Sequence, residues 1–221
     1  MDLFNMDAGK LIYELALRIV PFLMAITVHE FSHGFVAYLL GDNTAKNAGR
    51  LTLNPIAHID PIGLLCLLLT RMFGWAKPVP VNMAVVSRVK YGRLMVAAAG
   101  PLSNYILAVI SAALLFIIFK TGLLAGSTKV ATAMFGILYY SVVINVALGT
   151  FNLLPVLPLD GGRILENLLP RHIAYQYQKI EPYGMIIVIL LLVTGVLRPV
   201  FFPLIATISG ILTNPTLSLI F

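Results

Sequence analysis

Two histidines and a glutamate lie within five residues of each other in an otherwise apolar stretch of the chain. They form the pattern His29-Glu30-Phe31-Ser32-His33. On a helix, residues four apart share one face, so both imidazoles could bind one zinc ion at about 2.0–2.1 Å. Glu30 would then lie beside the remaining coordination position, where a carboxylate can take a proton from a water molecule. The spacing predicts metal-assisted hydrolysis.

The surroundings of this motif argue against a passive role. Three ionisable groups in an apolar helix carry an insertion cost of several kcal/mol, and such groups usually face a cavity, a partner or a metal. Capping, or snorkelling toward the membrane surface, would suit residues at a helix end. His29 and Glu30 instead lie well inside the apolar run of residues 11–40.

A catalytic zinc ion usually takes three protein ligands, so the motif is one ligand short. His58 and Asp60 follow on a loop, where a turn with local hydrogen bonds is favoured and a second metal site is the alternative. His172 lies in a basic loop and is expected to be solvated. Asp160, directly after a later apolar segment, is the best candidate for the third ligand.

Asp160 begins the sequence Asp160-Gly161-Gly162, which taken alone is also typical of a plain turn between helices. Its position favours a ligand. Asp160 follows one predicted span, and His33 lies toward the end of another that is expected to finish on the same side. Topology would therefore bring the two side chains to a similar depth.

The composition excludes a water-soluble protein. Of the 221 residues, 59% are hydrophobic and 11% are charged, whereas a soluble domain carries roughly 25% charged residues. The chain is predicted to be an integral membrane protein with a single domain over residues 1–221, since no stretch is left for a separate soluble domain. The net charge of +6 comes from basic loops, which indicates topology and no nucleic-acid partner.

The apolar segments predict an all-α polytopic membrane protein with about four to five transmembrane helices. Residues 11–40 would exceed the roughly 30 Å of hydrocarbon, so their first turns are expected in the interface, before a kink at Pro21. Residues 94–119 and 131–153 form clear spans. The run 183–197 is either a short span or the first part of a broken one that continues toward residue 212.

Shorter segments complete the fold. Residues 57–75 have an apolar core too short to cross, which predicts a re-entrant or interfacial helix. A short β-hairpin or edge strand is expected near residues 77–86, with an ordinary loop as the alternative. Cys66 is interpreted as apolar filler. The first apolar run is predicted to be a retained anchor, because no small-residue cleavage site ends it.

The basic residues predict the orientation. If residues 41–93 and 160–182 are cytoplasmic, ten Lys and Arg face the cytoplasm and five face the other side. The protein is then a multi-pass protein of the cell membrane, and its site lies toward the cytoplasmic leaflet.

Together the two motifs resemble the site-2 protease family of intramembrane zinc metalloproteases. That family joins a His-Glu-x-x-His helix to a later Asn-x-x-Pro-x-x-Pro-x-Asp-Gly motif, which residues 152–161 match in full. The resemblance covers most of residues 25–165. It is greatest to the short bacterial and archaeal branch, which lacks the PDZ and CBS domains of other branches, so any substrate-length filtering by a PDZ domain is in doubt.

The resemblance implies one Zn²⁺ per chain, held by His29, His33 and Asp160, with Glu30 as the base. It implies transmembrane protein substrates within the lipid bilayer. It also favours Asn152 as a hydrogen-bond donor to the oxyanion. The alternative is a hydrogen bond from the Asn152 side-chain amide to another helix. Substrate identity and homo-oligomerisation are left open.

Two rival functions use the same residues. A divalent-metal transporter could use the His/Glu/Asp cluster as a relay, but the other spans offer little polar lining beyond Asn104, Asn145 and Asn152. Asn104 itself is assigned to helix contact on a small-residue face. A catalytically silent, protein-binding relative is the third interpretation, although every residue that the chemistry requires is present.

Overall fold

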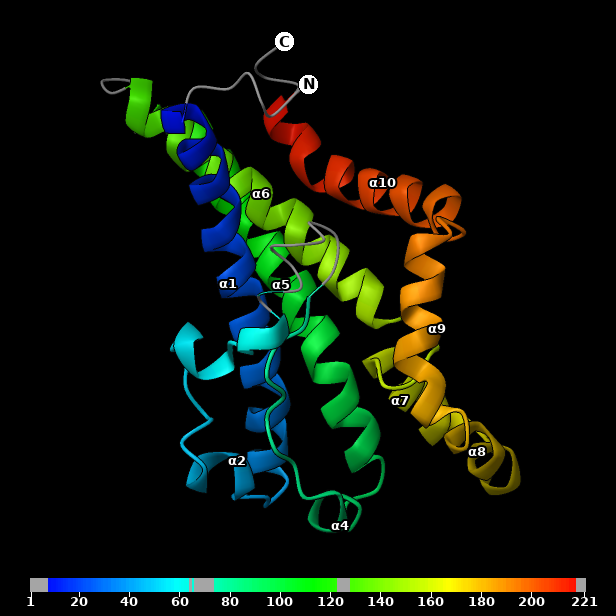
Figure 1. The fold of residues 1–221 in the computed structure, drawn as a ribbon. Coiled ribbons are helices and arrows are strands. Elements are labelled where there is room, and N and C mark those ends of the chain that lie inside the picture. Colours follow the sequence, from blue (N-terminus) through cyan, green and yellow to red (C-terminus); the bar gives the residue numbers. More distant parts are fainter. Residues whose placement is uncertain (1–7, 64, 66–73, 123–127, 218–221) are drawn as a thin grey trace.

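Three long helices form the body of the protein. The computed structural model describes residues 8–63, 65, 74–122 and 128–217. Helices α1 (Ala8–Leu39), α5 (Gly92–Thr121) and α6 (Thr128–Asn152) lie side by side (Figure 1). Each is long and apolar enough to cross a membrane, and α1 continues through Pro21 as a helix. The prediction of an all-α polytopic membrane protein is confirmed.

The C-terminal segment is a bent pair of helices. Helix α9 (Glu181–Val193) and helix α10 (Arg198–Leu217) meet at an angle of 81°. Gly195, at the break, has a φ of +71°, which glycine adopts without steric cost. Counted as one broken span, the pair raises the number of spans to four, the lower end of the predicted range.

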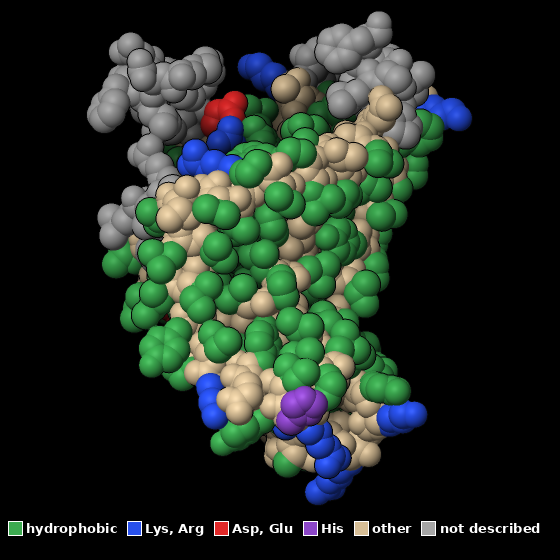
Figure 2. Space-filling view, turned by 90° about the vertical axis from the view of Figure 1, so that its right-hand side faces the viewer, with side chains coloured by type: hydrophobic (Ala, Val, Ile, Leu, Met, Phe, Trp, Pro, Cys, Tyr) green, Lys and Arg blue, Asp and Glu red, His purple; other side chains and the backbone are tan. Residues whose placement is uncertain are grey.

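Small side chains hold the long helices together. Ala108 and Ala112 of α5 meet Val142 and Val146 of α6 in a buried cluster, against which α10 places Ile205, Ile208 and Leu212. Small residues let helix backbones approach closely, and the resulting van der Waals packing is one of the contributions that drive helix association in a lipid environment. The outer surface stays apolar. Figure 2 shows hydrophobic side chains over the middle of one face, with the charged side chains mostly near its two ends.

Shorter elements lie along the second half of α1 (Figure 1). They are α2 (Thr44–Asn47), the 3₁₀ helix η2 (Pro55–His58) and α4 (Met83–Val86). Residues 61–63 and 65 are helical, while the rest of the predicted interfacial core, Cys66 included, lies outside the described residues.

The β-hairpin predicted near residues 77–86 is wrong. Residues 77–82 are a non-helical segment without strand pairing, and Asn82 then caps α4 by accepting a hydrogen bond from Ala84 N. Pro78 and Pro80 lack the N–H groups that a ladder needs, and the helical turn uses the residues of the expected second strand. Among the described residues the one β-bridge joins Ile59 to Ala76.

Candidate metal centre

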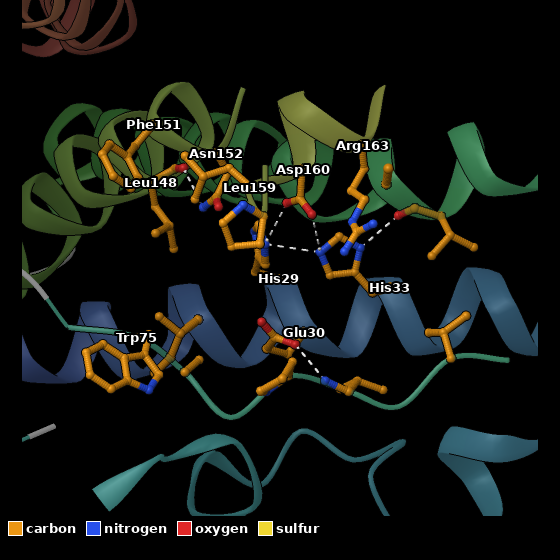
Figure 3. Close-up of a pocket in the computed structure, with 18 of the residues that line it drawn as sticks. His29, Glu30, His33, Trp75, Leu148, Phe151, Asn152, Leu159, Asp160 and Arg163 are labelled. Atoms are coloured by element: carbon orange, nitrogen blue, oxygen red, sulfur yellow. Dashed lines mark hydrogen bonds and ion pairs between the residues drawn. The ribbon is translucent and has the colours of Figure 1, made fainter. Parts of the chain in front are cut away.

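Two helices and a turn bring the predicted ligands together. His29 and His33 project from one face of α1, and Asp160 is the first residue of α7 (Asp160–Leu168). Helix α6 ends at Asn152, and the proline-containing turn of residues 153–159 returns the chain to the face of α1 that carries His29 and His33, as Figure 3 shows.

The hydrogen bond at Nδ1 of each histidine indicates which of its two ring nitrogens carries the proton. His33 Nδ1 lies 2.7 Å from Val96 O, and His29 Nδ1 lies 2.7 Å from Asn104 Oδ1. Both partners accept hydrogen bonds here, so both Nδ1 atoms must donate. In neutral imidazoles the two Nε2 atoms then carry lone pairs, the form in which histidine binds a metal.

With both imidazoles neutral, three electron-pair donors face one another. The two Nε2 atoms are 3.1 Å apart, and Asp160 places Oδ2 3.0 Å from His29 Nε2 and Oδ1 3.3 Å from His33 Nε2. Asp160 Oδ2 is buried and accepts no hydrogen bond. Such a cluster is repulsive by itself and favourable around a cation, and two imidazoles with one carboxylate suit zinc. All the ligand atoms lie within 4.8 Å of one another.

Helix α5 closes the other side of this cluster at Gly100. A Cβ atom at this position would lie 2.4 Å from His33 Nε2 and 2.6 Å from His29 Nε2. Real side chains do not approach a Cβ so closely, so only glycine lets the α5 backbone come this near to the ligands.

A cavity of about 700 Å³ opens beside the cluster and is lined by all three candidate ligands, Glu30 and Asn152. Glu30 faces the segment of residues 77–82, and its Oε2 accepts a hydrogen bond of 3.0 Å from Val79 N (Figure 3). Asn152 Nδ2 donates to Leu148 O of its own helix at 3.0 Å, so this bond is not the interhelical one considered from the sequence. The volume is in the usual range for small-molecule and cofactor sites.

The other histidines lie apart from the cluster. His58 is fully buried with its Nε2 2.8 Å from Thr52 O, and Asp60 Oδ1 accepts hydrogen bonds from the backbone of Ile62 and Gly63. The interpretation as a turn with local hydrogen bonds is confirmed. His172 is exposed, as predicted. Within the described residues, His29, His33 and Asp160 are the only group of three potential ligands.

Sequence reasoning missed a charged network behind Asp160. Glu166 is only 7% exposed and accepts a hydrogen bond of 2.7 Å from Gln178 Nε2, with Arg163 3.6 Å and Arg93 4.0 Å away. Arg163 also pairs with Glu181 at the start of α9. The network ties α7 to three other helices. The i, i+3 spacing of Arg163 and Glu166 was the signal available in the sequence.

A bundle of membrane-crossing helices that encloses two histidines, an aspartate and a glutamate defines a class: helical membrane proteins with a candidate metal site of hydrolase type. Comparison with known proteins gives the family. The sequence model of peptidase family M50 matches residues 81–195. The chain belongs to that family, the site-2 proteases, and is a metallopeptidase, a hydrolase that acts on peptide bonds.

Named relatives agree with this assignment. The chain is 40% identical over 188 residues to "Putative zinc metalloprotease YwhC" of Bacillus subtilis (strain 168), and the match covers 84% of both proteins. It is 33% identical over 194 residues to "Putative zinc metalloprotease Rip2" of Mycolicibacterium smegmatis, over 86% of this chain and 71% of the relative. No solved structure matches the chain significantly. The family does not favour the transporter alternative.

Proposed function

We propose that this protein is an intramembrane zinc endopeptidase that hydrolyses peptide bonds in or near the transmembrane segments of other membrane proteins. The observation that carries the proposal is the convergence of three lone-pair donors, from His29, His33 and Asp160, on a cavity among membrane-crossing helices. Such groups at membrane depth are costly unless they serve a function.

His29, His33 and Asp160 would hold one zinc ion per chain. When bound, zinc would supply Lewis-acid polarisation of the scissile carbonyl and of the attacking water. Glu30 takes the proton of that water and passes it to the leaving nitrogen. The hydrogen bond from Val79 N holds the Glu30 carboxylate at the cavity wall, which limits the positions from which it can act.

Asn152 is proposed as the donor to the oxyanion. One N–H of its amide is used by Leu148 O, and the second N–H is left for a group in the cavity that Asn152 lines. A preorganised donor at this point would favour the transition state more than the ground state, because negative charge develops on the carbonyl oxygen.

The substrate is expected to bind as an extended strand. Pro78, Val79 and Val81 line the cavity, and the non-helical segment of residues 77–82 to which they belong could pair with an unwound stretch of a transmembrane helix. Unwinding is required because the carbonyls of a helical substrate are already hydrogen-bonded. We propose that the site lies toward the cytoplasmic leaflet of the cell membrane, because more of the basic residues are expected on the cytoplasmic side. We also propose that residues 1–221 form one domain.

The test compares Glu30→Gln with Glu14→Gln in the purified full chain. Glu14 is on the same helix and pairs with Arg18 outside the cavity, so its variant is a matched control. Both variants and the wild type are expected to bind one zinc ion. Cleavage of a membrane-spanning reporter in liposomes should fall at least about 100-fold in Glu30→Gln only.

Undiminished cleavage by Glu30→Gln would refute the proposed base, and a wild type without bound zinc would refute the metal site. Zinc flux into the same liposomes would instead revive the transporter.

A further inference from the structure

A chain of buried amide and hydroxyl groups runs from His29 across α5 to α6. Asn104, fully buried on α5, accepts from His29 Nδ1 at 2.7 Å. Its own Nδ2 donates to Ala25 O at 3.1 Å and to Asn145 Oδ1 at 2.9 Å. Asn145 of α6, also fully buried, donates in turn to Ser141 O at 2.8 Å. Every polar atom of the Asn104 side chain is thereby used.

Two backbone carbonyls determine the direction of this chain. Ala25 O and Ser141 O can only accept hydrogen bonds, so each amide must present its NH₂ group to its carbonyl. Asn104 must then present Oδ1 to His29. Turning either amide over would set two acceptors against each other in a buried site, at the cost of an unmade hydrogen bond. The proton of His29 is thereby held on Nδ1.

The two histidines are oriented by different means. His33 donates directly to a backbone carbonyl, Val96 O on α5, and this acceptor cannot be removed by exchanging a side chain. His29 depends on a side chain and, through it, on a second helix. The lone pair of His29 Nε2 faces Asp160 and His33, and Asn104, which holds the His29 ring, is itself held by Ala25 O and Asn145.

We propose that Asn104 and Asn145 are positioning residues that fix the tautomer and the ring orientation of His29, and with them the zinc affinity of the site. This inference rests on the proposed zinc site. Outer hydrogen-bond partners of metal-bound histidines are often carboxylates or carbonyls. A neutral amide serves here because the position is buried among apolar helices, where an additional negative charge would be costly to desolvate.

The test measures zinc affinity by competition with a chromophoric chelator, on the full chain in detergent. Asn104→Leu keeps the number and branching of the side-chain heavy atoms but removes the acceptor, and it should weaken zinc binding by about 10- to 100-fold. Asn104→Asp should recover most of the affinity, since a buried acid can keep its proton toward Asn145 and still accept from His29. If Asn104 contributed only to stability, Asn104→Asp would not selectively restore the zinc affinity.

Tyr105→Phe is the matched control. Tyr105 follows Asn104 on α5, and its hydroxyl lies 2.8 Å from Thr150 Oγ1 of α6, so the variant removes a hydrogen bond between the same two helices without touching His29. Its zinc affinity should equal that of the wild type. If Asn104→Leu does not fold, Asn145→Leu supplies the comparison, with a smaller loss that still exceeds that of Tyr105→Phe.

A second readout does not need zinc. In the metal-free wild type, ¹⁵N NMR of the imidazoles should show the His29 proton on Nδ1. A proton on Nε2, or unchanged zinc affinity in folded Asn104→Leu, would overturn the inference. Absence of zinc binding in the wild type, with the proton still on Nδ1, would instead overturn the proposed metal site and leave the orientation of His29 by Asn104 and Asn145 standing.

Discussion

The close approach of helix α5 to the candidate metal centre can be tested by adding a single methyl group. In Gly100→Ala the new Cβ would lie 2.4 Å from His33 Nε2 and 2.6 Å from His29 Nε2. Real Cβ contacts start near 3.0 Å, so a histidine or α5 must move by roughly 0.6 Å. Zinc sites tolerate deviations of only about 0.2 Å in their bond lengths. The displacement therefore exceeds what the ligands can absorb.

Overpacking of this kind costs about 1–3 kcal/mol. If that strain falls on the metal-bound geometry, zinc affinity should drop by about 5- to 140-fold, because about 1.4 kcal/mol is a factor of ten. Chelator competition on the purified variant measures this loss, and reporter cleavage should decrease with zinc occupancy.

Gly210→Ala is the control for the exchange itself. Gly210 lies in the interior of α10, and apart from the backbone of α10 itself and the two neighbouring residues, no atom of the described residues lies within 4 Å of the place that the new methyl group would take. Its variant should keep wild-type zinc affinity and lose no stability. Wild-type zinc affinity in Gly100→Ala would show that α5 does not come this near to the ligands and would refute the reasoning.

Two further predictions concern the elements around the site. Gly184→Ala would place a Cβ 1.6 Å from Leu157 O, so α9 must separate from the turn before Asp160, and a clear fall in the melting temperature in detergent is expected. Burial raises the pKa of the Asp42 carboxyl, but hydrogen bonds from Thr44 and Asn82 outweigh it and hold that pKa below 3.8. The resulting stability is present above about pH 4 and lost as pH falls further. Melting curves against pH should show this loss of stability at acid pH in the wild type and a smaller loss in Asp42→Asn. Equal curves would contradict the contribution of the Asp42 carboxylate.

Local pattern was sufficient for most of the fold. The apolar runs at 94–119 and 131–153 predicted α5 and α6 to within a few residues, because a lipid environment requires every backbone polar group to be satisfied within a helix. The broken C-terminal span was one of the two alternatives that its length allowed. The hairpin failed because loose alternation over residues 77–86 also suits an unpaired segment followed by a helical turn, and periodicity does not say whether a partner strand exists.

The sequence by itself determined which groups could meet at the candidate site. Helical spacing places His29 and His33 on one face, and the shared end of two spans brings Asp160 to their depth. Only the tertiary structure decided how these groups are held. The His29 proton depends on Asn104, 75 positions away, and the access of α5 depends on the absence of a side chain at Gly100. Neither contact can be predicted from the periodicity of the sequence, because each depends on how whole helices pack.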